Sequence, residues 1–136
     1  MVGFAFTQLA LYDKVFAVDN CHFFAPLVKI AQGPEMCSSV TFPKCFGRKL
    51  AEELVIEGRP VKAERLERHG FLERFANIED AKKALQNHLA YLDELEWMSY
   101  LTARKLFRDP ERELLLKANK KAVSYTHLTL PTICSV

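Results

Sequence analysis

Residues 23–47 constrain the fold of this 136-residue chain more than any other segment. They read FFAPLVKIAQGPEMCSSVTFPKCFG, and Gly and Pro positions fix where regular structure can begin. Gly33 permits a tight backbone turn. Pro34 suits the first position of a helix, because its φ is already set and its missing N–H would be unpaired there. We therefore predict a helix that opens at Pro34 and whose apolar residues are Met36, Cys37, Val40 and Phe42.

One ionisable side chain of this segment, Glu35, is placed for chemistry. It falls in the first turn of the expected helix, and it follows an apolar strand with Phe23 and Phe24 and the pair Pro26-Leu27. A carboxylate in a first turn often does no more than complement the helix dipole. From the pattern alone, that structural role and a catalytic role both remain open.

Composition excludes several classes of protein. The length suits one domain with a real core, and a net charge of +2 is too small to indicate binding to nucleic acid or to an anionic membrane. No apolar stretch reaches the roughly 18 residues of a membrane span, and no basic segment precedes an apolar run as in a secretory signal. The cysteines, at positions 21, 37, 45 and 134, form no C-x-x-C pair, so we expect no metal site.

The rest of the chain alternates short strands and helices. Residues 4–12 are apolar enough for a buried helix, and residues 14–18 and 21–26 are rich in strand formers. Asp19-Asn20 between them is turn chemistry, which predicts a hairpin-like pair of strands. Gly47 separates the Glu35 helix from a second helix at 48–57.

Helices dominate after residue 70. A strand at 71–75 precedes Asn77, which we expect to cap a long helix at 78–97 with apolar residues at helical spacing. Two further helices, 100–107 and 111–121, are predicted on either side of Asp109-Pro110, because the residue before a proline disfavours the helical conformation.

The segment QGPEMCSSVTFPKCFG resembles Q-S-P-E-G-C-S-S-x-T-F-P-K-x-x-G of the peroxisomal type of Δ3,Δ2-enoyl-CoA isomerase, within the crotonase (enoyl-CoA hydratase/isomerase) superfamily. Residues 1–18 are similar to the same family's A-V-G-x-x-x-T-x-L-x-L-x-D-x-V-x-A segment. The resemblance extends over about residues 1–122 and is densest up to residue 75.

This resemblance implies an α/β fold, a partial crotonase-like ββα spiral followed by C-terminal helices. Family members are roughly twice as long as this chain, which corresponds to their C-terminal half and is expected to be a fragment. Residues 123–136 depart from the family and resemble a translated sequencing adaptor. We expect them to lie outside the fold, with no role for His127 or Cys134; the alternative is a genuine short, β-prone tail.

The resemblance also implies a chemistry. Glu35 would be the base that takes a proton from C2 of a fatty 3-enoyl-CoA and returns one at C4. The backbone N–H of Phe4, just after Gly3, would be one oxyanion-hole donor, the other lying outside this chain. The expected acyl-binding residues, whose apolar side chains would also raise the pKa of Glu35 by burial, are Leu27, Ile30, Met36 and Phe42.

Hydratases of the superfamily add water with two glutamates. This chain has Thr7 and Leu27 at the matching positions, and neither can activate water, so the single-glutamate isomerase pattern is favoured. The alternative is a non-catalytic acyl-CoA-binding or protein-interaction module, as in chromatin-associated relatives.

The resemblance implies the setting as well. It points to a homotrimeric or hexameric parent of the β-oxidation pathway in the peroxisome or mitochondrion, although no targeting signal is recognised in this chain. No metal or redox cofactor is expected, because the chemistry is proton transfer alone. The fragment by itself is expected to be inactive.

Overall fold

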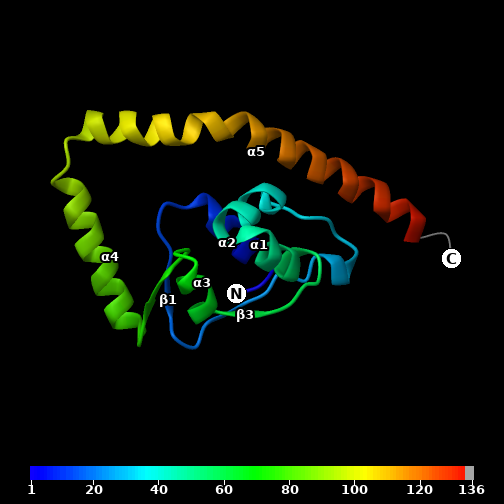
Figure 1. The fold of residues 1–136 in the computed structure, drawn as a ribbon, viewed down its shortest axis with the longest axis horizontal. Coiled ribbons are helices and arrows are strands. Elements are labelled where there is room, and N and C mark those ends of the chain that lie inside the picture. The colour runs from blue at the N-terminus through cyan, green and yellow to red at the C-terminus, as the bar shows by residue number, and fades with distance from the viewer. Residues whose placement is uncertain (134–136) are drawn as a thin grey trace.

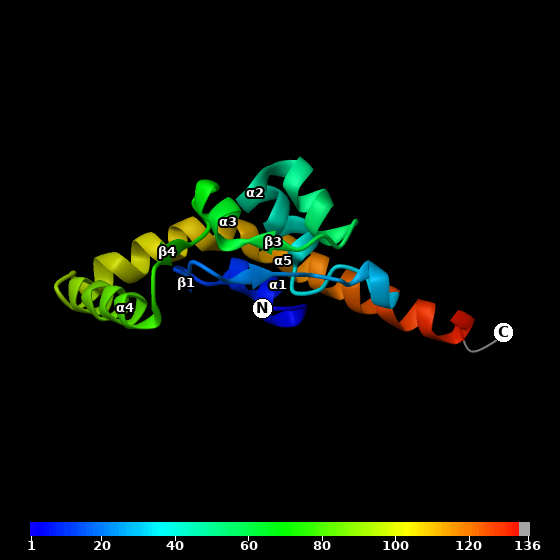
Figure 2. The same cartoon turned by 90° about the horizontal axis from the view of Figure 1, so that it is seen from below.

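The computed structural model describes the backbone of residues 1–133 and the side chains of residues 1–125. A small folded body is followed by two long helices that extend around it (Figures 1 and 2). The elements, in chain order, are α1 (Phe4–Thr7), η1 (Gln8–Leu11), β1 (Phe16–Val18), β2 (His22–Phe23), η2 (Val28–Ile30), α2 (Ser38–Val55), β3 (Val61–Lys62), α3 (Ala63–Arg68), β4 (Glu73–Phe75), α4 (Ile78–Asp93) and α5 (Trp97–Ile133).

Strand pairing is long-range, and the predicted hairpin is wrong. β1 pairs in parallel with β4, with Ala17 opposite Arg74, whereas β2 pairs antiparallel with β3, with Phe23 opposite Val61. The predicted turn does form, because the N–H of Cys21 donates to the carbonyl of Val18 at 3.0 Å. The turn, however, directs the two strands to different partners, and local turn chemistry carries no information about which distant strand completes each ladder.

The helix expected from Pro34 begins later. α2 starts at Ser38, and Met36 and Cys37 have left-handed φ values of 48° and 60°. Pro34 therefore lies in the irregular segment before the helix. Pro43 lies inside the helix. At Gly47 the backbone is non-helical, with φ 74° and ψ 161°, a conformation that favours glycine. The predicted break at Gly47 is therefore confirmed, as a kink between two helical segments.

An aromatic cluster forms the centre of the core. Phe6 of α1 is fully buried, and its ring centroid lies 5.2 Å from that of Phe23 and 5.0 Å from that of Phe42. Phe46 continues the cluster, 5.0 Å from Phe42 and 4.7 Å from Phe71. One buried side chain therefore joins α1, β2 and α2, and the neighbouring ring extends the contact to the segment before β4. Such tilted and edge-on ring pairs contribute more to the stability of the fold than their buried area alone would give.

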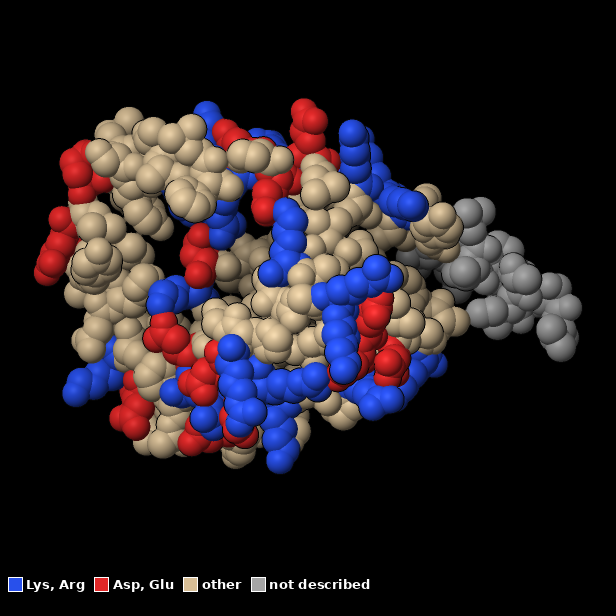
Figure 3. All heavy atoms as spheres, in the orientation of Figure 1, with Lys and Arg blue, Asp and Glu red and all other residues tan. Residues whose placement is uncertain are grey.

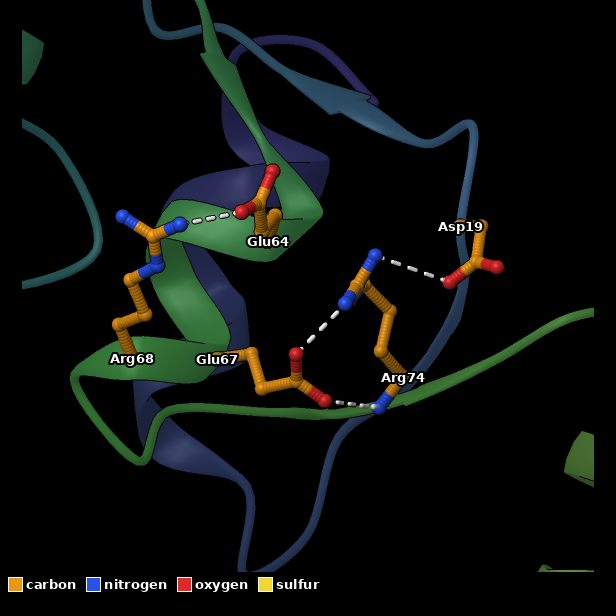
Figure 4. A network of polar contacts seen from close by, with 5 residues as sticks. All are labelled: Asp19, Glu64, Glu67, Arg68 and Arg74. Carbon is orange, nitrogen blue, oxygen red and sulfur yellow. Dashed lines mark hydrogen bonds and ion pairs between the residues drawn. The ribbon is translucent and has the colours of Figure 1, made fainter.

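Arg74 of β4 ties three segments together at the edge of the body (Figure 4). Its Nε donates to Oε2 of Glu67 on α3 at 2.8 Å, and its Nη1 lies 3.0 Å from Oδ1 of Asp19, just after β1. Its backbone N–H donates to Glu67 as well, at 3.3 Å. Because the Arg74 side chain is only 29% exposed, this network fixes the register of the parallel β1–β4 pair better than a fully solvated pair would.

The predicted start of α4 is confirmed, although the helix ends at Asp93 and not at residue 97. Asn77 caps the helix, its Oδ1 accepting from the N–H of Asp80 at 2.9 Å, as an N-cap asparagine should. Ala81 is its one buried residue, so most of α4 faces solvent. None of the helices among the described residues is both long and apolar enough to cross a membrane.

The predicted stop at Asp109-Pro110 is wrong, since α5 continues through it to Ile133. A proline inside a helix removes one backbone hydrogen bond and favours a kink, and Figure 1 shows that α5 bends partway along. Residues on both sides are held to the body: Arg108 contacts Asp13, and Glu111 contacts Lys44. These tertiary contacts favour helical continuity over the local preference of the Asp-Pro pair.

Residues 123–133 are helical, so the alternative of a β-prone tail is wrong for this part, while the expectation that residues 123–136 lie outside the fold stays a prediction. Val123 and Tyr125 are about half exposed. The side chain of His127 and the whole of Cys134 lie outside the described residues.

Phe6→Ala tests the central position of the aromatic cluster. Removing a fully buried ring that contacts three others should lower the free energy of unfolding by about 3–5 kcal/mol, since a cavity replaces it. Phe107→Ala is the matched control, because Phe107 is 86% exposed and should change stability by less than about 0.5 kcal/mol. Urea titrations of both variants, followed by circular dichroism, measure the difference; equal midpoints would contradict it.

Candidate active site

Glu35 lies in the turn that leads into α2. Its backbone carbonyl accepts from the Ser38 N–H at 2.9 Å and from the Ser38 hydroxyl at 2.7 Å, which closes the turn and fixes the position of the glutamate. Ser38 itself is fully buried, so this anchor is shielded from water. The side chain of Glu35 is thereby held on a constrained loop rather than on the first helical turn.

Burial raises the pKa of the Glu35 carboxyl above its ordinary value. Desolvation disfavours the charged form, and no side chain of residues 1–125 forms a hydrogen bond or ion pair with the carboxylate. A half-buried carboxylate without a stabilising partner is a stronger base than a solvated one, which is the property that a proton-transfer role needs.

The backbone after Glu35 is strained. Met36 and Cys37 are consecutive left-handed residues that are not glycine, and each costs roughly 1 kcal/mol or more. The isomerase segment quoted above has Gly where this chain has Met36. Met36 thus adopts a left-handed conformation to which Gly is better suited.

The Gly3–Phe4 segment has a backbone donor available. Gly3 has a left-handed φ of 58°, and its N–H is occupied, donating to the carbonyl of Phe24 at 2.7 Å. Phe4 opens α1, and within the described part of the chain its N–H donates no hydrogen bond. The ring contact between Phe6 and Phe42 connects this segment to α2, whose N-terminus follows Glu35.

The four expected acyl-binding residues occupy different environments. Leu27 and Phe42 are buried, at 1% and 0% exposure, and Phe42 packs in the aromatic cluster. Ile30 is 59% exposed on η2. Met36 lines a cavity.

At the two positions matching hydratase glutamates, the side chains cannot activate water. The Thr7 hydroxyl is buried and donates to the carbonyl of Phe4 at 3.2 Å, so its proton is engaged in that hydrogen bond. Leu27 has no titratable group. Neither position therefore supplies a second carboxylate beside Glu35.

A cavity of about 500 Å³ opens next to the Glu35 turn. It is bounded by Ala10 and Leu11 of η1, by Met36 and Cys37, and by residues of α5 between Arg108 and Asn119; Glu35 itself is not among its lining residues. The contribution of α5 was not predicted from sequence. The sequence feature that could have indicated this contribution is the spacing of Arg104, Arg108 and Arg112, which places three arginines on one helix face.

Glu35→Gln should stabilise the fold at neutral pH. Since the folded-state pKa is raised, the carboxyl carries no penalty below its unfolded value of about 4.3, and the penalty develops as the pH rises through the folded pKa. The amide removes that penalty, so the melting temperature at pH 7 should rise by roughly one to three degrees, and the difference should disappear near pH 4. Calorimetry at both pH values measures it, and a pH-independent difference would contradict the burial of the charge.

Met36→Gly and Met36→Ala separate backbone strain from side-chain packing. Both variants lose the Met side chain, but only Gly relieves the left-handed strain at φ 48°. The Gly variant should therefore be more stable than the Ala variant by about 1 kcal/mol, measured by urea denaturation. Equal stabilities would show that the turn relaxes when the side chain is removed.

Proteins of known identity resemble this chain over most of its length. It is 30% identical over 120 residues to enoyl-CoA delta isomerase 2 of Rattus norvegicus (88% of this chain, 31% of the relative) and 30% identical over 118 residues to the peroxisomal enoyl-CoA delta isomerase 3 of Mus musculus (87% and 37%). Over 62 residues it is 39% identical to testis-specific chromodomain protein Y 1 of Homo sapiens (46% and 12%). The chain spans about a third of the length of the two isomerases.

The fold has a close counterpart among solved structures. The crystal structure of an enoyl-CoA hydratase/isomerase from Pseudoalteromonas atlantica T6c superposes with a TM-score of 0.89 at 22% identity, covering 95% of this chain and 52% of that one. No protein-family model matches the chain. The predicted crotonase-like fold is confirmed, and the chain belongs to the crotonase (enoyl-CoA hydratase/isomerase) superfamily.

Proposed function

We propose that this segment carries the proton-transfer half of an enoyl-CoA isomerase that converts a 3-enoyl-CoA to the trans-2 isomer. The observation that supports this most directly is Glu35, a half-buried carboxylate with a raised pKa, held in a strained turn and without a partner among residues 1–125. The delta-isomerase names of the relatives support the same class of reaction.

The mechanism needs one base and a held enolate. Glu35 takes a proton from C2, which moves electrons toward the thioester oxygen, and then returns a proton at C4 from the same face. The N–H of Phe4 donates to the developing oxyanion, since preorganised backbone donors stabilise that charge. A second donor would come from outside the described residues.

The substrate would be a fatty enoyl-CoA, and coenzyme A would enter only as part of it. The reaction moves a proton without changing oxidation state, so we propose no metal or redox cofactor. The mouse relative's name supports a peroxisomal setting, with a mitochondrial one as the alternative, and a role in β-oxidation of unsaturated fatty acids. We also propose a homotrimeric or hexameric parent.

A second candidate is a non-catalytic acyl-CoA-binding or protein-interaction module. The observation that supports it is the 39% identity, over 62 residues, to the human testis-specific chromodomain protein Y 1. The two candidates differ in one measurable property, which is turnover.

Glu35→Gln tests the proposed mechanism. The amide keeps the shape of the carboxyl but cannot accept the C2 proton, so isomerase turnover should fall by about 10²–10⁴-fold while binding of a non-reactive acyl-CoA stays nearly unchanged. Because the segment spans a third of its relatives, turnover is measured both for this chain and for a chimera in which residues 1–122 replace the matching part of the rat isomerase. Calorimetry measures binding.

Glu52→Gln is the matched control, a glutamate on the surface of α2 whose loss should leave turnover unchanged. Undiminished turnover in the Glu35→Gln chimera would reject Glu35 as the base. Acyl-CoA binding without turnover in the unmutated chimera would favour the non-catalytic module.

A further inference from the structure

α5 is held to the body by polar contacts rather than by a buried apolar face. No residue of its described part, positions 97–125, is buried, and Leu106 and Phe107 are 71% and 86% exposed. A helix without a fully buried residue gains limited hydrophobic stabilisation from its position. The contacts that place it must therefore be found among charged and backbone groups.

Asp13 supplies two of these contacts. Its Oδ2 lies 2.9 Å from Nη2 of Arg104 and its Oδ1 lies 2.5 Å from Nη2 of Arg108, two residues one helical turn apart on α5. Arg108 also donates to the carbonyl of Leu11 at 3.1 Å. The hydrogen bond from Arg104 lowers the pKa of the Asp13 carboxyl, so the group stays ionised at neutral pH.

A second, weaker attachment lies further along α5. Nζ of Lys44 is 2.5 Å from Oε1 of Glu111, a single pair between side chains that are both nearly half exposed. Asp13, in contrast, engages two guanidinium groups through both of its oxygens. Charge-assisted contacts of this kind are stronger than a single lysine pair.

The cavity beside Glu35 lies between these attachments. Arg108 and Glu111 line its α5 side, and Met36 and Cys37 line the opposite side. The Cys37 thiol spans the gap, donating to the carbonyl of Leu115 at 3.3 Å, and Cys37 is only 8% exposed. Displacement of α5 would therefore widen the cavity and expose this thiol.

We infer that Asp13, Arg104 and Arg108 form an ionic latch that holds α5 over the cavity, and that releasing the latch opens the cavity at Met36 and Cys37. Because all three latch side chains are between 42% and 50% exposed, salt should screen them. Access to the cavity is thus set by an electrostatic contact at its edge, independently of whether Glu35 is a catalytic base.

Thiol labelling of the complete 136-residue chain tests this inference. Asp13→Asn removes the latch charge, and Cys37 should then react with a maleimide roughly threefold to tenfold faster than in the unmutated chain, the range that two exposed ion pairs allow. Raising NaCl from about 0.05 M to about 1 M should accelerate labelling of the unmutated chain toward the variant's rate, and should change the variant little.

The sequence provides its own controls. Tryptic cleavage after Lys29 and Lys44 releases residues 30–44, in which Cys37 is the one cysteine, so mass spectrometry reads this thiol alone. Cys21 reports on general loosening of the body, because it packs against the core away from α5. Glu52→Gln breaks the exposed Arg48–Glu52 pair of α2 and should not change Cys37 labelling.

A charge exchange separates the latch from a loss of folding. Asp13→Arg combined with Arg104→Glu and Arg108→Glu restores opposite charges across the same contact and should return Cys37 labelling to within about twofold of the original rate. Equal Cys37 rates in Asp13→Asn and the unmutated chain would overturn the inference. Parallel acceleration of Cys21 and Cys37 would overturn it as well, since the whole body would then have loosened.

Discussion

The ring contacts of Phe6 with Phe23 and Phe42 are the interaction on which the rest of the body depends. The strands are two or three residues long and pair with distant partners, so their few ladder hydrogen bonds cannot define the fold alone. Burying one ring between α1, β2 and α2 brings the Gly3–Phe4 backbone and the Glu35 turn onto the same core. The candidate donor and the candidate base are thus positioned by hydrophobic packing rather than by contact with each other.

Sequence reasoning succeeded where the signal was local. The Asn77 cap, the break at Gly47 and the strand ending at Phe75 each follow from residue types within a few positions. The motif around Glu35 also sufficed to identify the family. Sequence reasoning failed where a tertiary contact determines the structure. The partners of β1 and β2 lie more than 35 residues away in sequence. α5 continues through Asp109-Pro110 because Arg108 and Glu111 are anchored to the body.

The site shows the same division. The resemblance indicated Glu35, Gly3 and Phe4. It did not predict the left-handed turn at Met36 and Cys37. The periodicity of that segment is helical, and positive φ values are rare in residues other than glycine. Nor did it indicate that α5 borders the cavity. Figure 3 shows charges of both signs spread over the visible face.

Strain at Met36 and Cys37 and the polar attachment of α5 have a common consequence. Both leave the region around Glu35 less stable than the aromatic core, because one stores unfavourable backbone energy and the other replaces buried apolar contacts with screened ion pairs. A base must be desolvated to be strong, yet its site must admit a ligand. The buried Ser38 fixes the turn that carries Glu35, whereas α5, which borders the neighbouring cavity, has no buried residue among positions 97–125. Under the two proposals above, the base would stay in place while the cavity beside it opens.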